Sequence, residues 1–210
     1  MFVNYEPFVI IISSPSGAGK TTVCKMIIEK NPTIKLSISA TTRPQRPNEV
    51  NGKDYHFITK EQFLSLKNSS QFLEDAQVFN HFYGSYKKTL SDEINNSNCV
   101  LFDIDWQGAR QIKSKLPSEM VISIFILPPS LKELERRLRN RAQDSQEVVE
   151  QRMQQALDEI SHYHEYDFVI VNDDLNESLN KINSIIETKK INRQNISQLL
   201  TSKIFLNNND

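Results

Sequence analysis

Glycine is scarce in this chain, with only five among 210 residues. A glycine tolerates left-handed backbone and close approach by other segments, so in a glycine-poor protein each one marks a position where the backbone needs that freedom. Two of the five, Gly17 and Gly19, lie in one short segment directly after a run of apolar residues. That segment is the first place to look for a binding loop.

Cysteine is also rare, and the two cysteines, Cys24 and Cys99, lie inside apolar segments. The sequence contains neither a disulfide framework nor the ligand spacing of a metal site. We therefore expect two small buried side chains and a protein of the reducing cytoplasm.

The chain has neither an excess of one charge nor a long hydrophobic run. It has 25 basic and 26 acidic residues, so no overall charge attracts it to nucleic acid or to an anionic membrane. The longest apolar run, residues 8–12, is too short to cross a bilayer and lacks the basic flank of a signal peptide. We expect no nucleic-acid or membrane partner, and any phosphate binding must come from local clusters of arginine and lysine.

Short apolar segments without polar alternation predict buried strands at residues 9–13, 99–104, 121–127 and 167–171. Helical patterns follow them at residues 22–30, 107–116, 130–140, 146–163 and 174–190. Ser130 with Glu133, and Asp174 with Glu177, have the spacing of helix-capping pairs. Buried strands that are each followed by a helix indicate an α/β fold, with a parallel sheet covered by helices on both faces.

Residues 38–97 break this alternation. Extended pieces at 55–58 and 72–79 follow an Asn51-Gly52 turn, and Thr59 with Gln62 has the spacing to cap a short helix between them. We expect a mixed α/β insertion here. A second polar stretch, residues 139–151, has few apolar residues, and we expect it to form a mobile flap.

One segment between a strand and a helix has the composition of a phosphate-binding loop. Small residues let consecutive backbone N–H groups point at phosphate oxygens, and the dipole of the following helix favours the anion. Lys20 would reach the outer phosphates, and the hydroxyl of Thr21 would bind Mg²⁺. Ser14 stands where the general pattern has glycine, and an ordinary glycine-rich turn is the alternative. The loop comprises Ser14, Pro15, Ser16, Gly17, Ala18, Gly19, Lys20, Thr21 and Thr22.

Two carboxylates, Asp103 and Asp105, alternate at the end of a predicted buried strand and therefore face the same side. At the carboxyl edge of a parallel sheet they would open into the crevice where ligands bind. Asp103 would hold Mg²⁺ through water and Asp105 would reach a substrate, while a pair of helix-capping acids is the alternative. Asp105 and Gly108 also fit the Asp-x-x-Gly signature of a GTPase switch. A GTPase also needs an Asn-Lys-x-Asp motif, and the nearest match, residues 180–183, has Asn183 in place of the aspartate.

Arginines form a further group of candidates. Arg43 and Arg46 lie in a proline-stiffened segment, and the planar guanidinium binds phosphate through two hydrogen bonds. Arg137 and Arg141 are one helical turn apart, and Arg152 lies on the following predicted helix. Such cations on a closing flap would neutralise charge on a phosphoryl group in transfer. For any one of them, a solvated surface charge is the alternative.

Residues 8–190 of the chain resemble the guanylate kinase family. The resembling segments are the phosphate loop and residues 39–43, 46, 49–57, 72–74, 83–85, 103–108, 144–145 and 170–174, in the order of the family. A phosphate loop alone would indicate only a superfamily, whereas this ordered set indicates one family. The resemblance implies a Mg²⁺-dependent enzyme that uses ATP to phosphorylate GMP or dGMP, as a monomer or a homo-oligomer.

The resemblance also implies three parts: a core of residues 1–37, 98–129 and 163–210, a GMP-binding part of residues 38–97, and a lid of residues 130–162. The residues implied to read guanine are Ser39, Glu74, Ser85 and Asp105. Those implied to hold the GMP phosphate are Arg43, Arg46, Tyr55 and Tyr83, with Glu49 also in the GMP site. Those implied to contact ATP are Lys20, Arg137, Arg141, Arg152 and, near adenine, Asn172. The residues implied to be catalytic are Lys20, Arg43, Arg137, Arg141 and Arg152.

The chemistry of the residues agrees with this family. A carboxylate such as Glu74 accepts from both N–H donors of guanine, whereas adenine would leave its charge unpaired. In the lid, Asn140-Arg141-Ala142 replaces the family's Gly-Arg-Gly, which keeps the arginine and loses two glycines. Two alternatives remain: a kinase for another nucleoside monophosphate, and a catalytically inactive guanylate-kinase-like module that binds phosphopeptides.

Overall fold

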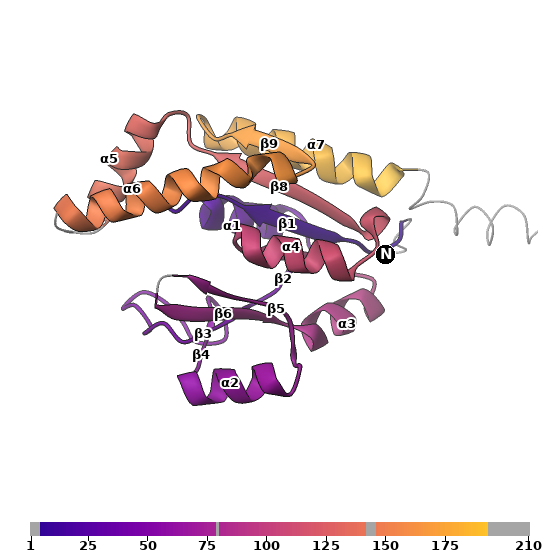
Figure 1. Cartoon of the computed structure of the whole chain (residues 1–210). Helices are drawn as coiled ribbons and strands as arrows, with labels where there is room; N and C mark the ends of the chain where they lie inside the picture. Colours follow the sequence, from indigo (N-terminus) through magenta and orange to yellow (C-terminus); the bar gives the residue numbers. More distant parts are fainter. Residues whose placement is uncertain (1–4, 79, 142–145, 193–210) are drawn as a thin grey trace, which may run out of the picture.

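The computed structural model describes residues 5–78, 80–141 and 146–192, without the side chains of residues 140–148. Its centre is a five-stranded sheet in the order β2-β7-β1-β8-β9, and all neighbouring strands run parallel (Figure 1). The strands are β1 (Val9–Ser13), β2 (Ile34–Leu36), β7 (Cys99–Asp103), β8 (Val121–Leu127) and β9 (Phe168–Val171). The predicted parallel sheet is confirmed.

Helices cover both faces of this sheet because its strands bury side chains on both. Ile10 and Ile12 pack with α1 (Lys20–Lys30) and α7 (Leu175–Ile191). Val9 and Ile11 point to the other face, where they pack with α3 (Lys87–Asn95) and α4 (Trp106–Lys115). Both cysteines are free and buried in the first of these two cores, as expected.

A smaller four-stranded sheet, in the order β4-β3-β6-β5, lies within the predicted insertion (Figure 1). Its strands are β3 (Ala40–Thr41), β4 (His56–Phe57), β5 (Phe72–Val78) and β6 (His81–Tyr86). Helix α2 (Lys60–Asn68) begins at the predicted capping box of Thr59 and Gln62. Its Phe63 packs against Phe72 and Phe82, with ring centroids 4.6 and 5.4 Å away. This part of the chain therefore has an aromatic core of its own.

Helices α5 (Leu131–Arg141) and α6 (Gln146–Ser161) form a pair at one end of the parallel sheet (Figure 1). Leu134, Leu138 and Ala156 make the core of this pair. Ser130 Oγ accepts a hydrogen bond from the Glu133 amide at 3.1 Å, as the capping spacing predicts. In the stretch assigned to a flap, residues 139–141 and 146–151 are helical, and residues 142–145 lie outside the described part.

The sequence missed several elements and misplaced some boundaries. β2 and β3 contain three and two residues, too few to show a periodic pattern, and β6 and α3 were also missed. α1 begins at Lys20, two residues before its predicted start, directly after the glycine loop. α6 ends at Ser161, and a 3₁₀ turn at His162–Glu165 replaces the predicted end of the helix. Within the described residues, every helix is too short or too polar to cross a bilayer.

Replacing Phe63 tests whether the smaller sheet has its own core. Phe63→Ala should lower the free energy of unfolding by about 3–5 kcal/mol, because a fully buried ring is removed. Leu64→Ala is the matched control, since its neighbouring side chain is 38% exposed. Chemical denaturation of both variants gives the comparison, and equal losses would contradict a packed core around Phe63.

Candidate active site

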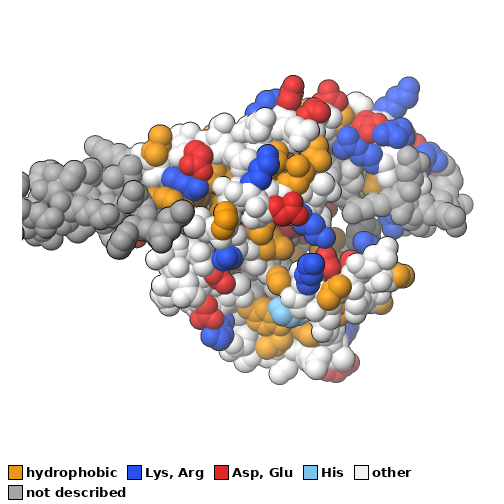
Figure 2. Space-filling model, turned by 180° about the vertical axis from the view of Figure 1, so that it is seen from behind, with side chains coloured by type: hydrophobic (Ala, Val, Ile, Leu, Met, Phe, Trp, Pro, Cys, Tyr) orange, Lys and Arg blue, Asp and Glu red, His pale blue; other side chains and the backbone are white. Residues whose placement is uncertain are grey.

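A cavity of about 890 Å³ lies where the carboxyl edge of the parallel sheet faces the smaller sheet and the α5–α6 pair. Figure 2 shows the molecule hollowed between these parts, with charged side chains around the opening. The phosphate loop and the end of β7 line one side, β5 and β6 line another, and α5 and α6 contribute side chains from a third. This edge is where open α/β sheets bind ligands.

The predicted phosphate loop joins β1 to α1. Gly17 and Gly19 have φ angles of +92° and +97°, in the region that other residues rarely adopt. The Ala18 amide donates to the Pro15 carbonyl at 3.2 Å, and α1 begins at Lys20. Backbone amides of a glycine loop at a helix N-terminus form a site for an anion. The scarce glycines are therefore placed where the loop requires them.

Asn172 contacts this loop directly. It is buried just beyond β9, and its side-chain amide donates to the Ala18 carbonyl at 2.9 Å. A Cβ on Gly19 would lie 2.8 Å from Asn172 Nδ2, so the loop backbone rests against this side chain. The sequence resemblance implies that Asn172 lies near adenine. In the structure the Asn172 side chain contacts the phosphate loop.

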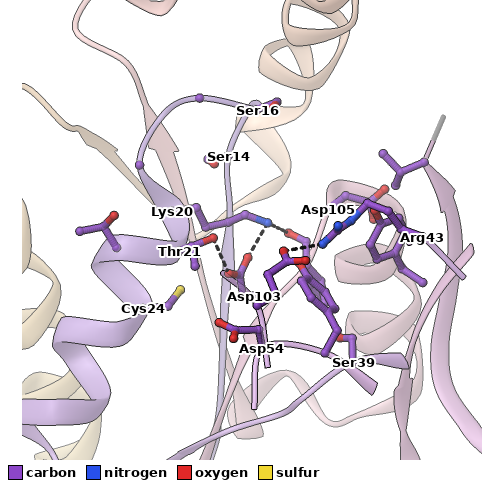
Figure 3. Close-up of a pocket in the computed structure, with 18 of the residues that line it drawn as sticks. Ser14, Ser16, Lys20, Thr21, Cys24, Ser39, Arg43, Asp54, Asp103 and Asp105 are labelled. Carbon is purple, nitrogen blue, oxygen red and sulfur yellow. Dashed lines mark hydrogen bonds and ion pairs between the residues drawn. The ribbon is translucent and has the colours of Figure 1, made fainter. Parts of the chain in front are cut away.

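Lys20 and Thr21 converge on Asp103 at the end of β7 (Figure 3). Lys20 Nζ lies 2.7 Å from Asp103 Oδ1 and donates to the Ile104 carbonyl at 3.0 Å. The Thr21 hydroxyl donates to Asp103 Oδ2 at 3.3 Å. Burial disfavours the charged amine, but the attraction of Asp103 outweighs it, so the pKa of Lys20 lies above its ordinary value. The ammonium group is therefore fully charged at neutral pH.

Glu74 of β5 is 2% exposed and belongs to a chain of polar contacts across the smaller sheet. The Ser85 hydroxyl donates to Glu74 Oε1 at 2.6 Å, and Ser85 Oγ lies 3.2 Å from Ser39 Oγ. Burial raises the pKa of Glu74 to about 7; the hydrogen bond from Ser85 opposes the rise, and the charge of Asp105 adds to it. A Cβ on Gly108 would lie 2.5 Å from Glu74 Oε2, so a side chain at this position would displace the carboxylate from where it lies.

Asp105 caps a helix, as one of the two alternatives from the sequence has it, and it also lies at the cavity. Its Oδ1 accepts from the Gly108 amide at 2.9 Å and so caps α4. Gln107 Nε2 donates to the other oxygen at 3.0 Å. The same residue lines the cavity together with Asp103 and Glu74. Capping therefore fixes this carboxylate at the cavity wall.

Cations and tyrosines gather on the side of the cavity formed by the smaller sheet and its loops. Arg43 lies 2.6 Å from Glu49 Oε1, and its guanidinium lies 5.4 Å from the centre of the Tyr55 ring. Burial opposes the charge on Arg43, but Glu49 outweighs it and raises the pKa of the guanidinium. Glu49 also accepts from the Arg46 amide at 2.8 Å, and the rings of Tyr55 and Tyr83 are 6.0 Å apart. All five predicted residues line the cavity.

The α5–α6 pair contributes Arg137 and Arg152 to the lining. Arg137 Nε donates to Glu133 Oε1 at 2.8 Å, which fixes the guanidinium along α5. The side chain of Arg141 is outside the described part of the chain. The sequence thus identified two cations that reach the cavity from elements far from the phosphate loop in sequence.

Sequence reasoning missed four charged residues in the lining, which are Lys25, Lys53, Asp54 and Glu159. Glu159 of α6 accepts a hydrogen bond from the Ser16 amide at 2.9 Å. Lys25 Nζ of α1 lies 3.1 Å from Asp54 Oδ1, and this ion pair joins the core to the segment before β4. These residues stand in polar helices and loops, where the local sequence does not distinguish a charged residue that reaches the cavity from one that faces solvent.

Three features define a P-loop kinase of the nucleoside monophosphate kinase class. A phosphate loop follows the first strand of a parallel sheet, the lysine of this loop pairs with a carboxylate on the adjacent strand, and a second wall of the cavity faces the loop. Residues 7–189 match the family model described as guanylate kinase. The chain belongs to the guanylate kinase family, and the resemblance found in the sequence is confirmed.

Relatives with this name align along most of the chain. The guanylate kinase of Rickettsia bellii is 50% identical over 186 residues, which cover 88% of this chain and 96% of the relative. That of Paramagnetospirillum magneticum is 47% identical over 192 residues, 91% of this chain and 89% of the relative. The crystal structure of guanylate kinase from Anaplasma phagocytophilum has a TM-score of 0.78 at 36% identity, covering 94% of this chain and 95% of that one.

Proposed function

We propose that the chain transfers the γ-phosphoryl group of ATP to GMP or dGMP, giving ADP and GDP or dGDP, in the cytoplasm. The observation that carries this proposal is that one cavity is lined by Lys20 of the phosphate loop and, on a facing wall, by Glu74 and Ser39, which both contact the buried Ser85 hydroxyl. Both substrates are small molecules, and the reaction needs no nucleic-acid or membrane partner.

The facing wall suits guanine. An ionised Glu74 can accept from the N1–H and the amino group of guanine, and the Ser39 hydroxyl can donate to O6. The Ser85 hydroxyl can donate to O6 as well once it turns its proton away from Glu74. Asp105 adds an acceptor at the same wall. Adenine presents no such donors at these positions and would leave a buried carboxylate unpaired, which rejects an analogue by about 10⁴-fold.

The phosphates would meet between the two walls. Arg43, Arg46, Tyr55 and Tyr83 would hold the GMP phosphate, while the loop amides, Lys20, Arg137, Arg141 and Arg152 would hold those of ATP. Lys20 would exchange its contact with Asp103 for phosphate oxygens. The adjacent Thr21 hydroxyl and Asp103 carboxylate fit Mg²⁺, which prefers oxygen ligands, and would hold it at the loop. Mg²⁺ held there would offset the charge of the nucleotide phosphates.

Transfer by this arrangement requires no strong general base, because the GMP phosphate is already anionic. Its oxygen attacks the γ-phosphorus in line, the bond from that phosphorus to the β–γ bridging oxygen breaks, and ADP leaves with the electron pair. Positioning by the loop and charge neutralisation by Lys20 and the arginines supply the catalysis. Closure of residues 38–97 and 130–162 over the core would exclude water and prevent hydrolysis of ATP.

A panel of nucleoside monophosphates tests the function. With ATP and Mg²⁺, a coupled assay of ADP release should give a kcat/KM for GMP about 10⁴-fold above that for AMP. Faster turnover of AMP or dTMP would indicate a kinase for another monophosphate. No turnover with any of them would leave the binding module as the function.

Replacing the loop lysine separates catalysis from acceptor binding. Lys20→Ala should lower kcat by about 10²–10³-fold, since a cation that neutralises the transferring group is lost. The Kd of GMP should change far less, because Glu74 and Arg43 lie on other elements. Lys30→Ala, at the exposed end of the same helix, is the control. Equal damage to turnover and GMP affinity would contradict this role for Lys20.

The raised pKa of Glu74 makes GMP binding dependent on pH. Below its pKa of about 7 the carboxyl is protonated and cannot accept both guanine N–H groups, so affinity is lost as pH falls through 7. Calorimetry should give a Kd about tenfold larger at pH 6 than at pH 8 from this group.

The GMP phosphate itself titrates near pH 6, at about the value of a phosphate monoester. Glu74→Gln is therefore the reference, because it keeps the contribution of the phosphate and removes that of the carboxyl. If both proteins show the same pH dependence, Glu74 does not read the guanine.

A further inference from the structure

The tip of the phosphate loop contacts both helices of the α5–α6 pair. A Cβ on Gly17 would lie 3.2 Å from Leu134 Cδ1 and 3.2 Å from Leu138 Cδ2, so the loop backbone lies against α5. At the adjacent residue, the Ser16 amide donates to Glu159 Oε2 of α6 at 2.9 Å. Figure 3 shows Ser16 on the loop above Lys20. The loop is therefore seated between an apolar contact and a polar one.

The polar contact joins a backbone amide to a carboxylate. A carboxylate accepting from a backbone N–H forms a charge-assisted hydrogen bond, about twice as strong as a neutral one. Glu159 is partly buried and lines the cavity. Burial raises the pKa of Glu159. The hydrogen bond from the Ser16 amide and the charge of Lys20 oppose this rise, and the charge of Asp105 adds to it. This carboxylate therefore lies close to the charges of the cavity, whereas the neighbouring Asp158 is exposed.

The same two helices carry the arginines of the cavity. Arg137 lies between Leu134 and Leu138 on α5, so it is one residue from the apolar contact. Arg152 precedes Glu159 by about two helical turns, which puts both side chains on the same face of α6. The core of Leu138 and Ala156 joins the helices to one another. Fixing the pair on the loop therefore fixes both guanidinium groups relative to the phosphates.

We propose that Glu159 is a positioning residue, which holds α6 on the phosphate loop so that Arg152 and Arg137 lie beside the phosphates of ATP. This inference rests on the proposed phosphoryl transfer. It predicts a loss in the transfer step with little effect on the guanine wall, because Glu74, Ser85 and Ser39 belong to the smaller sheet and the segment that leads into it.

The test compares substitutions that keep or remove the hydrogen bond. Glu159→Ala removes the acceptor, Glu159→Asp keeps the charge but shortens the reach, and Glu159→Gln keeps an acceptor of the same length. Asp158→Ala removes a carboxylate from the same turn, where the side chain is exposed. For each variant, kcat, the KM of ATP and GMP, and the melting temperature are measured on the full chain.

Glu159→Ala and Glu159→Asp should lower kcat by about 10²-fold, the cost of misplacing a charged group by roughly 1 Å, with the KM of GMP nearly unchanged. Glu159→Gln should retain most activity, and Asp158→Ala should match the parent protein. In a double-mutant cycle, Arg152→Ala should cost far less in the Glu159→Ala background than alone, because Glu159 acts through Arg152.

Three outcomes would overturn the proposal: additive losses in the cycle, a Gln variant as impaired as the Ala variant, or unchanged kcat in Glu159→Ala. If that unchanged kcat came with a higher affinity for ATP, the Glu159 carboxylate would be a competitor of the ATP phosphates instead of a positioning residue. If Glu159→Ala fails to fold, the Asp and Gln variants still give the decisive comparison. An inactive parent protein would instead reject the proposed function.

Discussion

The backbone of the phosphate loop must be held in one shape, because its amides bind an anion only when they point the same way. Two glycines at positive φ give the loop its path, and the hydrogen bond from Asn172 to Ala18 holds it on one side. The hydrogen bond from Ser16 to Glu159 holds it on the other. The loop is thus fixed by segments from the end of β9 and from α6, which are distant in sequence.

The parallel sheet determines what faces the loop. Since β1 and β7 are neighbours and run parallel, their carboxyl ends bring Lys20 and Asp103 together, and the chain after β7 starts α4 at Asp105. The N-terminus of α4 approaches Glu74 of the smaller sheet, which the absence of a side chain at Gly108 permits. One sheet edge therefore sets the positions of the loop cation, the loop hydroxyl and the carboxylates of the facing wall.

Much of this arrangement was predictable from the sequence. Continuous apolar segments predicted the parallel sheet, the glycine-rich segment with Lys20 predicted the loop between β1 and α1 that lines the cavity, and the capping pairs at Ser130 and Thr59 predicted two helix starts. The paired contacts were not predictable, because Glu159 and Ser16 meet only after the sheet has brought α6 to the loop. The strands β2 and β3 were missed since they are too short for periodicity and depend on their neighbours for hydrogen bonds. Asn172 likewise shows its contact with the loop only in three dimensions.

The central claim is that the loop around Lys20 and the wall around Glu74 bind two nucleotides whose phosphates face each other across one cavity. A crystal structure with GMP and a non-hydrolysable ATP analogue tests it most directly. We expect the outer phosphates of the analogue on the loop amides, guanine against Glu74, and a GMP phosphate oxygen about 3–3.5 Å from the γ-phosphorus. Nucleotides bound elsewhere, or with their phosphates pointing apart in a closed form, would contradict the account.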